Sequence, residues 1–247
     1  SFRFLIEKGF HLIQGLYQDQ AHLVRNLFVL VLFYILICWL SAKLTRSEKD
    51  IKGSGIPQVE AELKGLMSLN WWGVLWRKYI LGILAIASGL MLGREGPSIQ
   101  LGAVGGKGIA KWLKSSPVEE RSLIASGAAA GLAAAFNAPI AGLLFVIEEV
   151  YHHFSRFFWV STLAASIVAN FVSLLIFGLT PVLDMPDNIP LMTLDQYWIY
   201  LFMGIFLGLS GFLYEKAVLN VSKVYDWLGQ KIHLDRAYYP LLAFILI

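Results

Sequence analysis

The chain has 247 residues, of which 57% are hydrophobic and 15% are charged, and its net charge is +3. This composition is too apolar for a soluble domain. Hydrophobic stretches recur along nearly the whole length of the chain. This pattern predicts an all-α protein that crosses a membrane several times. The single cysteine, Cys38, excludes an internal disulfide and a thiolate cluster, and the adjacent His152 and His153 have poor metal-ligand spacing. We therefore expect no metal and no cofactor.

The first hydrophobic stretches define the start of the membrane region. Residues 1–16 predict an apolar helix, and residues 23–44 predict a helix long enough to span a bilayer. The loop at 45–52 has a basic bias, which favours the cytoplasm. Residues 58–66 form a short amphipathic segment. After it, Trp71, Trp72 and Trp76 resemble an aromatic belt at a membrane surface.

Two short hydrophobic segments, residues 79–92 and 97–112, flank a charged pair, Arg94 and Glu95. Each segment is shorter than the ~20 residues that a span needs. Interrupted segments of this kind indicate a transporter binding site, and charge at membrane depth is a functional candidate. Pro97 favours a helix start, so free N–H groups and a positive dipole end would face Glu95. The pattern predicts an anion site in which the Glu95 carboxylate competes with the anion.

The second half of the chain alternates apolar helices with polar turns. Residues 122–136 are small and apolar, the helix breaks at 137–139, and residues 140–150 end in Glu148 and Glu149. A further span is predicted at 157–177, followed by an acidic segment outside the membrane and another apolar stretch at 197–213. Three glycine pairs with four-residue spacing predict close helix packing: Gly102 with Gly106, Gly127 with Gly131, and Gly204 with Gly208.

One internal repeat is readable. Residues 4–8 (Phe-Leu-Ile-Glu-Lys) resemble residues 212–216 (Phe-Leu-Tyr-Glu-Lys), and an apolar match follows each of them. The charge bias gives the two copies opposite orientations, as in inverted-repeat transporters. We therefore predict a first membrane repeat over residues 1–192 and the opening of a second inverted repeat over residues 193–247.

Three motifs in order resemble the CLC family of chloride channels and proton-coupled chloride transporters: residues 53–57 (Gly-Ser-Gly-Ile-Pro), residues 93–97 (Gly-Arg-Glu-Gly-Pro), and residues 127–149 with Phe-Asn-Ala-Pro inside. The resemblance implies inverted-repeat architecture, with half-length helices pointing at a mid-membrane anion site. It covers about the first half of the family's core, and the later Gly-x-Phe-x-Pro motif is absent. We therefore expect a C-terminal half of the same protein as a partner, without which this stretch would not transport.

The resemblance also implies a function and its residues. Glu95 corresponds to the gating glutamate, Glu149 to the internal proton-transfer glutamate of exchangers, and Glu148 would support water entry beside it. The implied anion-binding set is Ser54, Gly55, Ile56, Arg94 and Gly96, with Lys78 in support. The expected activity is chloride/proton exchange by a homodimer in the plasma (inner) membrane. Chloride, protons and the lipid bilayer are its partners, and no nucleic acid is expected. Relatives that prefer fluoride have another residue at the position of this serine, so the presence of Ser54 favours chloride as the transported anion.

Each of these residues also has a plainer interpretation. Ser54 could only shape a tight turn, Glu95 could only pair with Arg94, and Lys78 could extend its amine to the cytoplasmic surface. Two other functions also stay open. One is a passive CLC-type anion channel. The other is a rhomboid-like intramembrane serine protease, indicated by Gly-Leu-Ser-Gly at 208–211 and lacking a well-placed histidine base.

Overall fold

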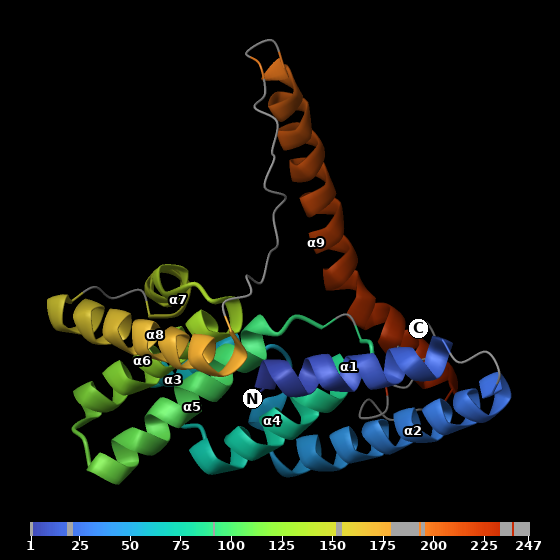
Figure 1. Cartoon of the computed structure of the whole chain (residues 1–247), viewed down its shortest axis with the longest axis horizontal. Helices are drawn as coiled ribbons and strands as arrows, with labels where there is room; N and C mark the ends of the chain where they lie inside the picture. The colour runs from blue at the N-terminus through green and yellow to red at the C-terminus, as the bar shows by residue number, and fades with distance from the viewer. Residues whose placement is uncertain are drawn as a thin grey trace. The chain divides into compact units, whose positions relative to one another are not determined.

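The computed structural model describes residues 2–18, 22–90, 92–151, 155–178, 193, 196–232 and 239, and the regular structure within these ranges is entirely helical (Figure 1). This confirms the all-α prediction. The chain divides into two compact units, Ser1–Val182 with Leu241–Ile247, and Leu183–Pro240. The first unit contains the helices that carry the predicted site residues.

The helices follow one another in chain order, mostly with short connections. They are α1 (Phe2–Gln18), α2 (Leu23–Ser47), α3 (Ile56–Leu63), α4 (Trp71–Ala87), α5 (Glu95–Leu113), α6 (Pro117–Phe136), α7 (Pro139–Phe145), α8 (Arg156–Phe177) and α9 (Trp198–Ile232). A 3₁₀ turn, Lys49–Ile51, precedes α3, and a π-helical segment, Val146–Tyr151, continues α7.

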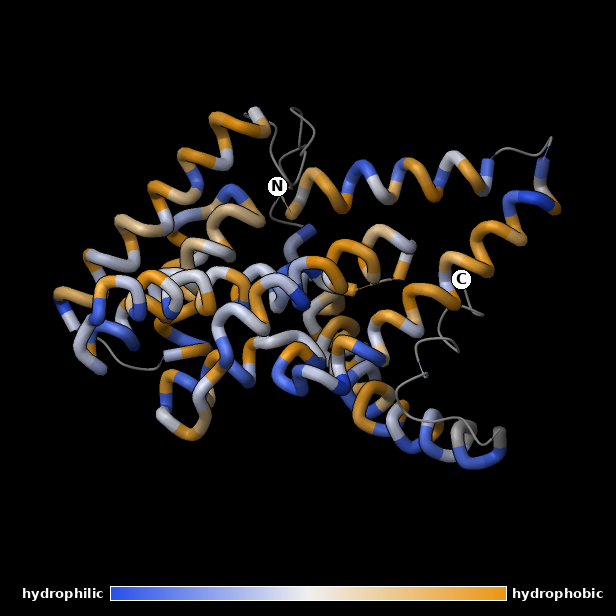
Figure 2. The backbone as a smooth tube through the Cα atoms, turned by 90° about the horizontal axis from the view of Figure 1, so that it is seen from below, coloured by the Kyte–Doolittle hydropathy of each residue, from blue (hydrophilic) through white to orange (hydrophobic). Residues whose placement is uncertain are grey.

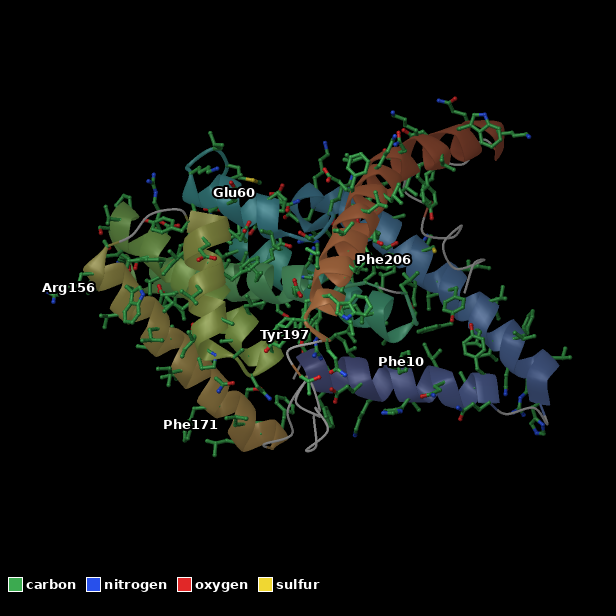
Figure 3. The ribbon with its side chains drawn as sticks, turned by 90° about the horizontal axis from the view of Figure 1, so that it is seen from above. Phe10, Glu60, Arg156, Phe171, Tyr197 and Phe206 are labelled. Carbon is green, nitrogen blue, oxygen red and sulfur yellow. The ribbon has the colours of Figure 1, made fainter. Side chains whose placement is uncertain are left out.

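Three of the described helices are long and apolar enough to cross a membrane, namely Val24–Ser47, Arg156–Phe177 and Trp198–Trp227. All three fall on hydrophobic stretches predicted from the sequence. Hydrophobic residues recur along the length of the helices in Figure 2. On α8, Phe171 points away from the neighbouring helices and is 59% exposed (Figure 3). Such apolar outer faces are suited to lipid or to another protein surface.

Helices α5 and α6 form the most extensive helix–helix contact of the first unit and lie side by side in Figure 1. A Cβ atom added at Gly102 would collide with the carbonyl oxygen of Gly127, and one at Gly127 would collide with that of Gly102. Gly106 and Gly131 likewise lie against backbone of the facing helix. The predicted close packing of these two glycine pairs is therefore confirmed. The pair on α9 has no neighbour this close among the described residues.

A buried apolar core joins α3 to the α5–α6 pair. Its most buried members include Val59 of α3, Ile99 of α5 and Ala125 of α6, each at 0% exposure. Val146 and Phe158 extend the same core to the π-helical segment and α8. Because α3 and α5 share this core, their first turns are held in a fixed relation.

Several helices begin earlier than their sequence patterns predicted, among them α4, α5 and α6, which starts at Pro117 and not at residue 122. Helix α4 starts at Trp71 because Asn70 caps it, with the Asn70 Oδ1 accepting the Gly73 N–H at 3.2 Å. The tryptophans of the predicted belt therefore lie within α4. Helix α5 starts at Glu95, two residues before Pro97, so Glu95 belongs to the first turn itself.

Candidate functional site

A cavity of about 550 Å³ lies where the first turns of α3 and α5 meet α4. From the α3 side it is lined by Gly53, Ser54 and Ile56, and from the α5 side by Gly93, Glu95 and Gly96. The Lys78 side chain of α4 also borders it. The structure thus brings together five predicted site residues that are up to 42 positions apart: Ser54, Ile56, Lys78, Glu95 and Gly96.

The start of α3 is shaped by glycine and proline. Gly55 adopts φ +101°, a left-handed conformation that favours glycine, and Pro57 occupies the first turn. The Ile56 N–H donates to the Ser54 Oγ at 3.2 Å. This bond supports the turn-shaping interpretation of Ser54. The hydroxyl proton remains able to donate, and Ser54 is exposed at the cavity wall.

The start of α5 lies directly against the Ser54 loop. A Cβ atom at Gly96 would overlap the carbonyl oxygen of Ser54, so only glycine allows this approach. In the first turn of α5, the Glu95 and Gly96 N–H groups have no intrahelical acceptor, while Pro97 has no N–H. The Ser98 N–H donates to the Arg94 carbonyl at 3.1 Å and begins the regular ladder. Two helix N-termini therefore meet at one cavity, each with a partial positive charge.

Lys78 is buried, with 5% of its surface exposed. Its Nζ donates to the carbonyl oxygens of Ile51 at 3.0 Å and Gly53 at 2.7 Å. Lys78 therefore does not extend to the surface, and its supporting role at the anion site stays a prediction. The ammonium adds positive charge at the cavity wall and ties the backbone before Ser54 to α4.

Arg94 and Glu95 border different cavities. Arg94 lines a second cavity of about 420 Å³ between α1, α4, α5, α6 and α8, whereas Glu95 lines the first. The Arg94 guanidinium lies 5.5 Å from the centre of the Phe136 ring. Arg94, which was predicted to bind the anion together with Ser54, therefore does not line the cavity that Ser54 lines.

Glu148 and Glu149 lie on the π-helical segment Val146–Tyr151, and both are exposed. Neither lines either of the two cavities. A π-helical turn is rare and often marks a functional position. The turn also carries Val146 and Val150 into the buried core, which leaves the two carboxylates on the opposite side.

Sequence reasoning missed Gln58 and Gln100, whose side chains bind the backbone just before Ser54. Gln100 is fully buried on α5, one turn after Gly96. A lone glutamine in an apolar helix carries little sequence signal. The one available indication was that Gln100 lies four residues after Gly96, because residues with this spacing share a helix face.

The cavity has the chemistry of an anion site. It combines a serine hydroxyl, two helix N-termini and a buried ammonium group, all of which favour negative charge. The Glu95 carboxylate lies in the same cavity and would compete with a bound anion for these donors. Among the described residues, no group of three or more histidine, cysteine, aspartate or glutamate side chains could hold a metal ion.

A sequence profile of the voltage-gated chloride channel (CLC) family matches residues 9–247. The chain belongs to this family. The family is one of ion-transport proteins and not of enzymes, which answers the serine protease alternative. The one histidine that follows the Gly-Leu-Ser-Gly stretch, His233, lies outside the described residues.

Similar proteins are known from several bacteria. The H(+)/Cl(−) exchange transporter ClcA of Vibrio vulnificus is 39% identical over 177 residues, covering 70% of this chain and 38% of that protein. ClcA of Cronobacter sakazakii is 36% identical over 222 residues, covering 87% and 47%. The crystal structure of a slow cyanobacterial Cl−/H+ antiporter superposes with a TM-score of 0.82 at 31% identity, covering 93% of this chain and 54% of that one. The chain thus spans about two fifths to half of the length of these relatives.

Proposed function

We propose that this chain carries the chloride-binding and gating half of a chloride/proton exchanger. The carrying observation is that Ser54 and Glu95 border one cavity at the meeting point of two helix N-termini. In the proposed mechanism, chloride occupies this cavity against the Ser54 hydroxyl and the free N–H groups. The ionised Glu95 competes with chloride, and protonation of Glu95 releases the carboxylate and opens the path.

Proton coupling requires a second carboxylate, and we assign this role to Glu149. Two relatives that resemble this chain are named as H(+)/Cl(−) exchange transporters, and a third is described as a Cl−/H+ antiporter. Glu149 matches the internal proton-transfer glutamate of such exchangers, and Glu148 beside it would admit water. The exposure of both side chains on the π-helical turn is compatible with proton exchange with a water-filled entry.

The proposed assembly is a homodimer within the plasma (inner) membrane, organised as two inverted repeats. The outer faces of α8 and α9 are rich in exposed large apolar side chains such as Phe171 and Phe206. Apolar faces of this kind are suited to lipid or to a second subunit.

The gating proposal is tested by Glu95→Gln, which mimics the protonated carboxylate. In liposomes reconstituted with the complete exchanger, including its C-terminal half, chloride efflux should stay substantial, whereas uphill proton movement driven by a chloride gradient should stop. If Glu95→Gln moves protons uphill at the parent rate, the gating role is wrong. A parent protein whose reversal potential ignores pH would instead support the passive channel.

The proton-transfer role is tested separately by Glu149→Gln, with Glu119→Gln as the matched control. Glu119 is also an exposed glutamate, but it lies in the first turn of α6 and lines neither cavity. Glu149→Gln should abolish proton movement and retain chloride efflux, while Glu119→Gln should retain both fluxes. Equal loss of both fluxes in Glu149→Gln would indicate a structural role for this residue.

A further inference from the structure

The backbone before Ser54 has an uncommon hydrogen-bonding pattern. The carbonyl oxygens of four consecutive residues, Asp50 to Gly53, each accept a hydrogen bond from a side chain. The Gln100 Nε2 donates to Asp50 at 2.8 Å and the Gln58 Nε2 donates to Lys52 at 2.9 Å. The Lys78 Nζ serves the remaining two carbonyls, those of Ile51 and Gly53.

The three donor side chains come from three different helices. Two of these side chains are neutral amides, and the third is an ammonium group. Gln58 lies in the first turn of α3, Lys78 in α4 and Gln100 in α5. In both glutamines the Oε1 is buried and lacks a hydrogen-bond partner among the described residues. The amide orientation is nevertheless fixed, because turning either amide would place its oxygen against a carbonyl oxygen. In both glutamines the Nε2 therefore donates to this backbone while the Oε1 stays without a donor.

Helix α5 also forms the surface on which the loop rests. Gly96 and Gln100 are one turn apart, so they share a helix face, and both contact the loop at 54–55. A Cβ atom added at Gly55 would lie 2.5 Å from the Gln100 Oε1. Gln100 thus contacts the loop that presents Ser54 and binds the segment before it.

The electrostatic consequence concerns the sign of the ion that the cavity accepts. Carbonyl oxygens carry partial negative charge, repel an anion and, when grouped, coordinate cations. Ile51 and Gly53 both line the cavity. Both of their carbonyl oxygens accept from the Lys78 Nζ, a cation that offsets this negative charge. The two glutamines bind the carbonyls of Asp50 and Lys52, which do not line the cavity, so they act by holding the loop in place.

We propose that Gln58, Lys78 and Gln100 are positioning residues that make the cavity selective for anions. They occupy the carbonyl oxygens of residues 50–53 and hold the loop so that Ser54 and the two helix N-termini face the ion. The proposal rests on the proposed chloride site and adds the residues that set its selectivity. None of the three needs to touch chloride for this role.

The test measures chloride binding by calorimetry in detergent and the rise in melting temperature that chloride produces over gluconate. The variants are Gln100→Met, Gln58→Met and Lys78→Met, with Lys78→Arg as the conservative variant. Gln14→Met serves as the control, because Gln14 is exposed on α1 and does not line the cavity. Ligand stabilisation depends on the ratio of ligand concentration to Kd, so it reports on the site even if basal stability changes.

Each Met variant should raise the chloride Kd about three- to tenfold and reduce the chloride-dependent rise in melting temperature. Lys78→Arg should recover much of the binding lost in Lys78→Met, and Gln14→Met should match the parent. If Gln100→Met does not fold, Gln58→Met at the half-buried start of α3 decides the matter. Variants that lose basal stability but bind chloride like the parent overturn the positioning role alone. A parent protein that binds no chloride overturns the proposed function itself.

Discussion

The buried ion pair between Glu62 and Lys107 offers a sharp test of how α3 is held against α5. The side chains are 7% and 2% exposed, and the Lys107 Nζ lies 2.5 Å from the Glu62 Oε1. The same ammonium donates to the Ser68 Oγ at 3.0 Å and to the Leu69 carbonyl at 2.8 Å, and the Glu62 Oε2 accepts the Leu69 N–H. The pair therefore joins the end of α3, the following loop and the middle of α5.

Replacing Lys107 with methionine keeps most of the side-chain volume and leaves the Glu62 carboxylate buried without its cation. Removing one partner of a buried pair costs about 3–5 kcal/mol, because a buried charge is left uncompensated. The chain contains a matched control in the pair of Lys64 with Glu60, also at 2.5 Å, where the Lys64 side chain is 51% exposed. Solvent screens such a pair, so Lys64→Met should cost at most about 1 kcal/mol.

The measurement is equilibrium unfolding in mixed micelles with a rising fraction of SDS, followed by tryptophan fluorescence. The double variant Glu62→Met with Lys107→Met should be more stable than Lys107→Met alone, because no buried charge remains. It should not recover fully, since the Leu69 N–H and carbonyl each lose a partner at about 1–3 kcal/mol. Equal costs for Lys107→Met and Lys64→Met, or strictly additive effects in the double variant, would refute this reasoning.

Three further predictions use other parts of the structure. Ser54→Ala should weaken chloride binding by roughly 0.5–1.5 kcal/mol in calorimetry, because a hydroxyl donor is lost, and unchanged affinity and anion selectivity would exclude direct coordination. Gly102→Ala should destabilise the protein by about 1–3 kcal/mol or prevent folding, because a Cβ would overlap the backbone of α6, whereas Gly105→Ala on the same helix has open space and should be tolerated; similar melting temperatures for the two variants would contradict the close contact. Hydrogen bonds from Ser116 lower the pKa of Glu119, so the ionised form stabilises the fold above the ordinary pKa of 4.5 and this contribution disappears as the pH falls through the lowered value. Glu119→Gln should therefore lower the melting temperature at neutral pH and match the parent in strong acid; a constant difference across pH would argue against the ionised cap.

Much of the fold could be predicted from local sequence patterns. The break at Asn137 and the spans on α2 and α8 depend on neighbouring residues. The start of α6 was missed, because the apolar run begins at residue 122 whereas the helix begins at Pro117, behind the capping box of Ser116 and Glu119. The close packing of α5 and α6 was also predictable, because glycines at four-residue spacing leave a flat helix face that another helix can approach closely. These features follow from helix periodicity and backbone sterics, which act over a few residues.

The sequence indicated several of the residues that line the cavity, but only part of their geometry, and their role in anion binding stays a prediction. Glycine, proline and charge at membrane depth indicated Ser54 and Glu95, and the structure brings both to one cavity. Arg94 was predicted at the same site and instead lines a different cavity. Adjacent residues in a helical turn point in different directions, so a motif fixes which residues are present but not the direction that each side chain takes.

The sequence by itself determined that this chain is an assembly of apolar helices with glycine-rich motifs and a carboxylate beside one of them. Tertiary structure alone decided where the long polar side chains find their partners. Lys78 reaches the carbonyl of Gly53, Gln100 reaches that of Asp50, and Lys107 pairs with Glu62 across 45 positions. A buried ammonium or amide must satisfy its hydrogen bonds with whatever group the packing of helices brings near, and that group is set by how α3, α4 and α5 cross rather than by any spacing along the chain.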